Sequence, residues 1–139
     1  MRHFVQYHNS ATRGPYQRGQ FRIVTAKPVD SLLGDQIWLV NREGDPSRYW
    51  LCETFVVEEV DHDATAGPQG NRVSARSGRS FDPPVPIDSA DWFTTLQHDT
   101  GNFAFGLQRI NNPKIIRGLF RIASGNDSGG ASSSIRTDS

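Results

Sequence analysis

The residues that could carry out catalysis are scattered along this chain and do not form a recognisable motif. The 139 residues contain no Gly-x-Ser-x-Gly elbow, no phosphate-binding glycine loop and no His-x-Glu with a cysteine pair. The run Asp61–Asp63 places a histidine between two aspartates, but consecutive loop residues seldom all reach one ion. We therefore expect no metal, no other cofactor and no enzyme activity of the chain by itself.

Tyr7, His8 and Asn9 stand at the end of a predicted strand, just before a loop that contains glycine and proline. Binding residues concentrate at such junctions, where a rigid scaffold holds side chains that face solvent. The single cysteine, Cys52, lies in the middle of another predicted strand, where a free thiol behaves as a small buried hydrophobic group. One cysteine excludes an internal disulfide, so we expect a reducing, cytoplasmic environment.

The charges balance, with 15 Lys+Arg against 15 Asp+Glu and a formal net charge of zero. Their types and positions are uneven, because 13 of the basic residues are arginine and residues 64–122 carry seven basic and four acidic side chains. Arginine offers a planar fork that suits specific recognition. The neutral total argues against tight, non-specific binding of nucleic acid but leaves room for selective binding.

Hydrophobic periodicity predicts the elements that must position these residues. Strand patterns occupy residues 3–8, 21–25, 36–40, 48–60, 73–81 and 102–110. Helical patterns cover residues 89–97, with Asp88 as the N-cap, and a segment that begins after Asn112. The apolar residues of that second helix are Ile115, Ile116, Leu119 and Phe120. The segment 48–60 exceeds the usual strand length, so we expect a bend or bulge within it.

A single domain over residues 1–122 contains nearly all of the hydrophobic residues. From residue 123 the composition changes to Gly, Ser, Asn and Asp, which cannot bury a core, so residues 123–139 are expected to be a disordered tail or the beginning of a linker. The mean hydropathy of −0.56 leaves no stretch near the roughly 20 apolar residues of a membrane span. We therefore expect no membrane partner.

Two patterns resemble the PUA-like superfamily, which includes the ASCH, EVE, YTH and SRA-type domains. The first is Gly34-Asp35, the apolar strand 36–40, a glycine-containing loop and the long strand that ends in Phe-Val-Val-Glu-Glu-Val. The second combines Phe-Val-Gln-Tyr-His-Asn (4–9), Phe-Asp-Pro-Pro (81–84), Trp-Phe (92–93) and Gly-Asn-Phe-Ala-Phe-Gly-Leu-Gln-Arg-Ile (101–110). This combination is most similar to EVE-type N-terminal domains of bacterial modification-dependent restriction proteins, which are often joined to an HNH nuclease.

The resemblance covers about residues 1–122 and implies a fold and a ligand. The fold is of the α+β class, a small curved PUA-like β-barrel of about five or six strands with two or three short flanking helices. Members of the superfamily bind a nucleobase, often methylated, and some flip it out of the duplex. Such a reader needs ring faces for stacking and a few fixed donors and acceptors for the edge of the base.

Carried over to this sequence, the resemblance assigns two groups of residues. The base-binding pocket consists of Tyr7, His8, Asn9, Trp38, Trp50, Asn102 and Phe103. The residues assigned to phosphate binding are Arg76, Arg79 and Arg109. Stacking on a ring contributes on the order of 1–3 kcal/mol per base, so one pocket can discriminate a modified base without a strongly basic surface.

The predicted function is a binding module that recognises a modified nucleobase in DNA and targets an associated nuclease domain or subunit in bacterial defence. Two alternatives stay open. The first is an RNA-binding PUA-like domain. The second is a small nucleoside amidohydrolase of ASCH type, built from His8, Asp35 and Glu53.

Overall fold

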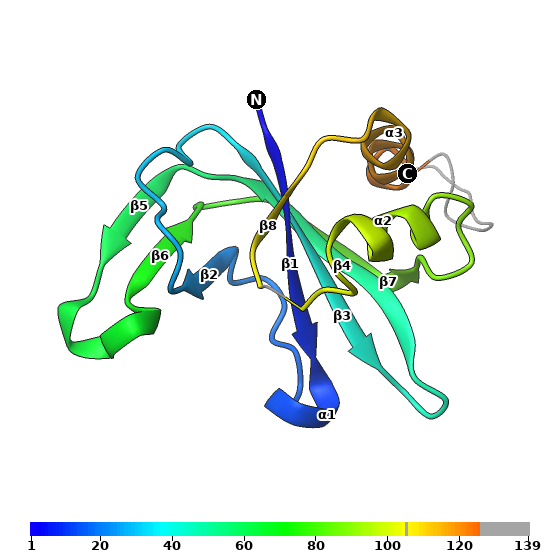
Figure 1. Ribbon diagram of the computed structural model, residues 1–139, viewed down its shortest axis with the longest axis horizontal. Helices are drawn as coiled ribbons and strands as arrows, with labels where there is room; N and C mark the ends of the chain where they lie inside the picture. The colour runs from blue at the N-terminus through cyan, green and yellow to red at the C-terminus, as the bar shows by residue number, and fades with distance from the viewer. Residues whose placement is uncertain (105, 126–139) are drawn as a thin grey trace.

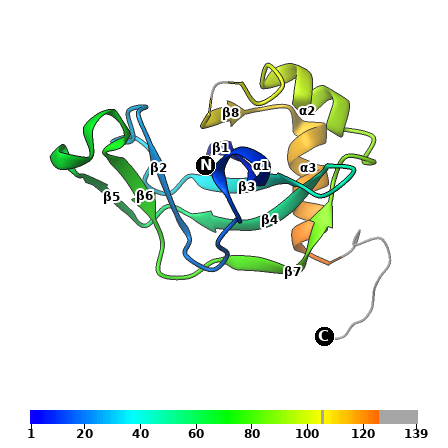
Figure 2. The same cartoon turned by 90° about the horizontal axis from the view of Figure 1, so that it is seen from below.

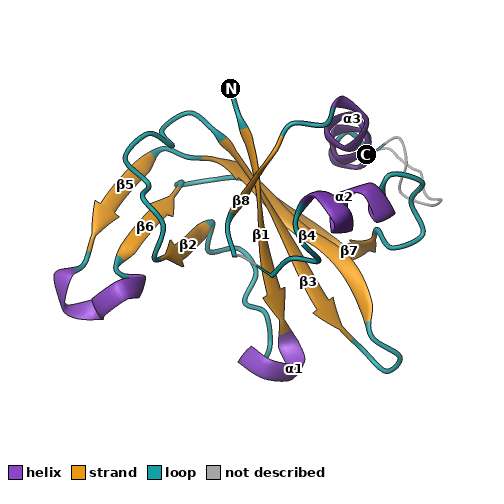
Figure 3. Cartoon of the chain, viewed as in Figure 1, coloured by secondary structure: helices purple, strands orange, loops and turns teal. Residues whose placement is uncertain are grey.

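The computed structural model describes residues 1–104 and 106–125, which form an α+β structure (Figure 1). The strands are β1 (His3–Asn9), β2 (Arg22–Thr25), β3 (Gln36–Glu43), β4 (Arg48–Val56), β5 (Glu59–His62), β6 (Asn71–Ser74), β7 (Arg79–Pro86) and β8 (Gln108–Ile110). The helices are α1 (Ser10–Arg13), the 3₁₀ helix η1 (Ala64–Gln69), α2 (Phe93–Asp99) and α3 (Pro113–Ala123). Figure 3 shows this division into strands and helices and confirms the predicted α+β class.

Five strands form one sheet in the order β7-β4-β3-β1-β8. β1 and β3 pair in parallel, from His3 opposite Gln36 to Asn9 opposite Arg42, whereas the other neighbours in this sheet are antiparallel. Parallel strands end at the same edge of a sheet. The carboxyl ends of β1 and β3 therefore lie side by side, next to α1 and the β3–β4 hairpin (Figure 1).

The segment 48–60, predicted as one long strand, is two strands that belong to different sheets. The register of β4 against β3 and β7 shifts around Cys52, and the pairing passes from β4 to β5 after Val56. β5 pairs with β6 in a second, antiparallel sheet of order β2-β6-β5, and the chain returns to the first sheet from β6 to β7. The register shifts beside Cys52 confirm the predicted irregularity, and the chain passes from the first sheet to the second after Val56.

Alternate residues of β3 enter two separate cores, because successive side chains of a strand point to opposite faces. Trp38 and Val40 pack with residues of α2 and α3. Ile37 and Leu39 pack with residues of the three-stranded sheet. In Figure 2 the helices α2 and α3 and the strands β2, β5 and β6 lie on opposite sides of the five-stranded sheet.

The ends of two predicted elements differ from the structure. α2 begins at Phe93 rather than at residue 89, because the Asp88 carboxylate pairs with Arg48 at 2.6 Å instead of capping a helix. In α3, Phe120 is 43% exposed and does not belong to the buried face, which Ile122 completes instead. The predicted strand 102–110 is reduced to β8.

The described strands form two sheets, and this pairing alone does not establish the closed barrel that the resemblance implies. α3 ends at Ala123, one residue beyond the expected domain boundary. Most of the expected tail, residues 126–139, lies outside the described residues. No helix within residues 1–104 and 106–125 is long and apolar enough to cross a membrane.

Candidate functional site

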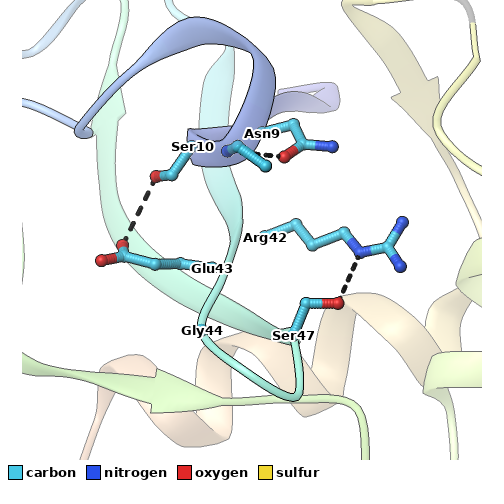
Figure 4. A pocket seen from close by; sticks show the side chains of 7 residues that line it. Asn9, Ser10, Arg42, Glu43, Gly44 and Ser47 are labelled. Atoms are coloured by element: carbon cyan, nitrogen blue, oxygen red, sulfur yellow. Dashed lines mark hydrogen bonds between the residues drawn. The ribbon is translucent and has the colours of Figure 1, made fainter.

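A hollow of about 510 Å³ lies at the edge of the sheet where β1 and β3 end. The β1–α1 junction forms one wall and the β3–β4 hairpin forms the other (Figure 4). The lining residues are Asn9, Ser10, Ala11, Arg42, Glu43, Gly44 and Ser47. Because most of these side chains are polar, a ligand here would be held by hydrogen bonds and charge.

Asn9 and Arg42 are partners in the β1–β3 register, and their side chains extend to the same side of the hollow (Figure 4). Asn9 caps α1, since its Oδ1 accepts from the backbone N–H of Ala11 at 3.0 Å. The cap uses the amide oxygen and leaves the Nδ2 group pointing outward. Arg42 donates from Nε to the Ser47 hydroxyl at 3.1 Å, which holds its guanidinium with the terminal nitrogens directed outward.

The opposite side of the hollow is built on a hydrogen-bonded network around the buried side chain of Asn41. Asn41 donates from Nδ2 to Glu43 Oε1 at 2.9 Å, and its Oδ1 lies 2.8 Å from His8 Nδ1. The Ser10 hydroxyl is 3.2 Å from Asn41 Oδ1 and 3.4 Å from Glu43 Oε1. Because Asn41 offers its oxygen to His8, the His8 ring carries its proton on Nδ1. One buried amide thus orients three side chains.

The helix-covered face carries an aromatic cluster at the same end of the sheet. The rings of Tyr7 and Phe103 stack with centroids 5.0 Å apart, and Tyr49 lies 5.5 Å from Phe103. The guanidinium of Arg42 covers Tyr49 at 5.3 Å from its ring centroid. Phe103 is buried, whereas Tyr7 and Tyr49 are partly exposed. The cluster therefore extends from the core to the rim of the hollow.

A left-handed turn delivers Phe103 to this cluster. Gly101, Asn102 and Phe103 have φ values of 59°, 58° and 63°. The left-handed region costs a residue with a β-carbon about 1–2 kcal/mol, so neighbouring groups must hold the turn. The Phe103 amide donates to the buried hydroxyl of Thr100 at 3.2 Å, and the Asn102 amide donates to the Gln97 carbonyl at 2.7 Å. This turn also explains why the strand predicted over 102–110 is mostly lost.

A buried carboxylate ties the loop after α1 to the sheet. Glu53 is 1% exposed and accepts from the Tyr16 hydroxyl at 2.7 Å, the Gly19 amide at 2.8 Å and the Ser80 hydroxyl at 3.1 Å. Burial, together with the hydrogen bond to Glu53, raises the pKa of Tyr16 well above its usual range. The Tyr16 ring meets His8 edge-on at 5.4 Å, so this anchor supports the network beside the hollow.

The structure brings only part of the predicted base-binding set to the hollow. Asn9 lines it, Tyr7 and Phe103 belong to the adjoining aromatic cluster, and His8 belongs to the network on the other face. Trp38 was also assigned to this set, but its side chain is fully buried in the core, where its Nε1 donates to His3 Nδ1 at 3.2 Å. A strand that is buried on both faces cannot present this ring to a ligand.

Trp50 and Asn102 lie near the site but do not line the hollow. Trp50 is half-buried and donates from Nε1 to the backbone carbonyl of Glu43 at 3.2 Å, so it supports the hairpin from behind. Asn102 is exposed on the left-handed turn, where its Oδ1 accepts from Gln97 at 3.2 Å. Trp50 therefore supports the hairpin, and Asn102 lies outside the lining of the hollow.

The three arginines predicted to contact phosphates do not share one surface. Arg79 and Arg109 lie on β7 and β8, at the two opposite edges of the five-stranded sheet. Arg76 follows β6, and its backbone amide donates to Glu58 at 2.7 Å. These positions form no single phosphate track, and the arginine beside the hollow is Arg42.

The residues considered for hydrolysis either lie far apart in the fold or are already engaged in structural hydrogen bonds. Asp35 precedes β3 and Asn41 lies opposite His8, so six residues, about 20 Å of strand, separate Asp35 from the His8 end. Burial acts to raise the pKa of Asp35, but hydrogen bonds from Arg2 outweigh it and hold the pKa below its usual value. Burial raises the pKa of the Cys52 thiol to about 12, so it is a poor nucleophile.

The loop 61–63 uses its charged groups for structure. Asp61 pairs with Arg72 at 2.7 Å, and Asp63 caps η1 through the amide of Thr65 at 3.0 Å. His62 lies between Asn71 and Asp30. In the part of the chain that the structure describes, no three His, Cys, Asp or Glu side chains are grouped so that they could hold a metal ion.

Sequence reasoning missed Asn41, Glu43 and Arg42 as site residues. They follow the apolar run of β3 and look like the beginning of an ordinary polar turn. Asn41 and Glu43 do keep the two-residue alternation of the strand, which places them on one face. Their importance arises from the parallel pairing of β3 with β1, which no local pattern reveals.

Comparison with known proteins adds no family assignment. No protein-family model matches the chain. No curated protein matches it either.

Proposed function

We propose that this chain is a nucleic-acid-binding module that accepts one nucleobase at the hollow between α1 and the β3–β4 hairpin, with a modified base in DNA as the preferred ligand. In this proposal the two sheets act as a small PUA-like barrel whose open end forms the site. The observation that carries the proposal is the position of the hollow, between a fixed polar network and an Arg-capped aromatic cluster. Recognition of a base needs both kinds of group.

The size and polarity of the hollow suit a nucleotide. Its volume of about 510 Å³ lies within the range of about 300–1,000 Å³ that is typical of small-molecule sites. Glu43 Oε1 is fixed by Asn41 and Ser10, which leaves Oε2 to accept from an amino or imino group of a base. On the opposite wall, the cap of Asn9 engages only its Oδ1, which leaves its Nδ2 group to donate to a ligand at the rim of the hollow. Fixed donors and acceptors reject an incorrect edge because a group left unpaired is costly.

Arg42 can serve two parts of one nucleotide. Its guanidinium lies over the ring of Tyr49, 5.3 Å from the ring centroid, and its bond to Ser47 engages only Nε. The outward terminal nitrogens suit the phosphate that flanks a bound base, because arginine contacts phosphate through two parallel hydrogen bonds. The associated nuclease belongs to this proposal as a separate domain or subunit that the bound module positions on DNA.

The site supports binding better than turnover. The buried carboxylate of Glu53 accepts three hydrogen bonds that hold a loop in place. The thiol of Cys52 is buried with a raised pKa. Groups engaged in this way hold the scaffold and are not poised to transfer protons or attack a substrate.

Exchange of Glu43 for glutamine tests whether the hollow is the binding site. Glu43→Gln keeps the size of the side chain but removes the charge, and loss of a hydrogen bond to a charged group costs about 1.5–3 kcal/mol. We expect the affinity for the preferred duplex, measured by fluorescence anisotropy, to fall at least about tenfold.

The matched control is Glu59→Gln, which makes the same change on exposed β5 in the other sheet. It should bind as the unchanged protein does. Equal affinities of Glu43→Gln and this control would place the ligand elsewhere and overturn the proposed site.

A further inference from the structure

The exposed side of α3 carries a row of cations. Lys114, Arg117 and Arg121 are spaced three and four residues apart, which places them within about 60° around the helix axis. All three side chains are exposed. α3 contains no acidic residue. The hollow does not use this surface, because α3 lies near the N-terminal end of β1 whereas α1 and the hairpin lie at the other end (Figure 1).

Little opposing charge neutralises this row. Lys114 approaches Asp91 at 3.7 Å, and that aspartate side chain is itself 80% exposed. Among the ion pairs of the described residues, none involves Arg117 or Arg121. Arg79 contacts the C-terminal end of α3, where its guanidinium donates to the backbone carbonyl of Ala123. One of the three arginines assigned to phosphate binding therefore contacts α3.

We infer that the exposed side of α3 is a second nucleic-acid contact, which binds the phosphate backbone and does not read the base. The choice of partner rests on the proposed function. Arginine pairs with phosphate in a bidentate geometry, and two of the three cations are arginine. Along the axis, Lys114 and Arg121 are about 10.5 Å apart, so the row can reach more than one phosphate of a strand.

The burial of α3 favours nucleic acid over an anionic membrane. Helices that bind membrane surfaces insert an extensive apolar face into the lipid. In α3 that face is already used, since Ile115, Leu119 and Ile122 are at most 5% exposed in the core. Gly118 packs directly against the ring of Trp92, which fixes the helix in place. The row of cations therefore belongs to a rigid surface.

The test is the salt dependence of binding to an unmodified DNA duplex. Each phosphate that a cation neutralises adds about 0.9 to the slope of log affinity against log salt concentration. We expect the double variant Arg117→Ala/Arg121→Ala to lower the magnitude of that slope by about 2 and to weaken binding uniformly across sequences. The ratio of affinities for modified and unmodified duplexes should stay unchanged.

The matched control is Arg22→Ala/Lys27→Ala, which removes two exposed cations in and just after β2 of the three-stranded sheet. If the α3 variant shows the same salt-dependence slope as the unchanged protein, the inference is overturned. The same holds if the control variant lowers the slope as much as the α3 variant does. Binding to phosphatidylserine vesicles without binding to the duplex would also overturn it. If the α3 variant behaves as expected but the unchanged protein does not distinguish modified from unmodified DNA, the proposed base recognition fails and the α3 contact stands.

Discussion

The hydrogen-bond partners of single side chains determine their charge states, and His62 shows this most clearly. Its Nδ1 lies 2.7 Å from Asn71 Oδ1 and its Nε2 lies 3.0 Å from Asp30 Oδ1. Asn71 keeps this orientation because its Nδ2 donates to the Lys27 carbonyl at 2.8 Å. An imidazole donates from both nitrogens only when it is protonated. The bond to Asn71, followed by the bond to Asp30, raises the pKa of His62 above 6.5.

This raised pKa predicts a pH-dependent contribution to stability. The contribution is fully present below the unfolded pKa of about 6.5 and is lost as the pH rises through the higher folded value. Urea unfolding of the unchanged protein and of His62→Gln should therefore show a difference in stability that shrinks over this window. Parallel stability curves, or a His62 pKa at or below 6.5 by NMR titration, would contradict the assignment.

At the residue scale, the sequence predicts exposed positions better than buried partners. The strand end at Tyr7–Asn9 was predicted to be a binding region because it meets a loop, and Asn9 does line the hollow. Trp38 was assigned to the pocket, but its side chain is buried in the core, since ring chemistry alone does not distinguish a core residue from an exposed one. Asn41 was missed because its role depends on hydrogen bonds with His8 and Glu43, which form only when the chain is folded.

At the scale of elements, close packing fixes α3 against the loop that precedes α2. A β-carbon placed at Gly118 would lie 2.1 Å from Trp92 Nε1, well inside contact distance. Although alanine favours a helix over glycine by about 1 kcal/mol, this clash requires the indole or the helix to move. The packing should dominate, because Trp92 is only 3% exposed.

We therefore expect Gly118→Ala to lower the free energy of unfolding by about 1–3 kcal/mol, as overpacked cores do. Chemical denaturation measures this change. Arg117→Ala is the control, since it alters an exposed position of the same helix and should change stability by no more than about 0.5 kcal/mol. A more stable Gly118→Ala protein would show that the helix does not pack against Trp92 as described.

Local patterns predict the existence of most elements but not their pairing. The strands at 3–8 and 36–40 and the helix after Asn112 were identified from periodicity and capping residues. The parallel pairing of β1 with β3 joins residues more than 30 positions apart, so no local pattern contains it. α2 begins later than predicted because its expected cap, Asp88, serves a distant arginine.

At the scale of the whole molecule, the five-stranded sheet separates two kinds of chemistry and joins them at one end. Polar groups gather on the face toward the three-stranded sheet, aromatic groups gather on the face toward the helices, and the hollow lies where both faces end. The α+β class was predicted from the sequence. Closure into a barrel depends on contacts between sheet edges that are distant in the sequence, so no local pattern predicts it. The barrel therefore remains a proposal.

The positions of the arginines matter more for binding than the zero net charge does. The arginines are spread over both sheet edges, the hollow and α3, and many pair with carboxylates. Such a surface gives modest phosphate contact rather than tight binding along any duplex. Under the proposed function, selectivity would then come from one site, where a wrong base typically costs about 1–3 kcal/mol.

The most direct test of base recognition is an affinity comparison with the unchanged protein at one fixed salt concentration. The ligands are duplexes of one sequence that carry methylcytosine, hydroxymethylcytosine, methyladenine or no modification, together with an RNA hairpin. We predict that one modified duplex binds at least about tenfold more tightly than the unmodified duplex and the RNA, equivalent to about 1.4 kcal/mol. Equal affinity for all the DNA duplexes, or tighter binding of the RNA, would contradict the account.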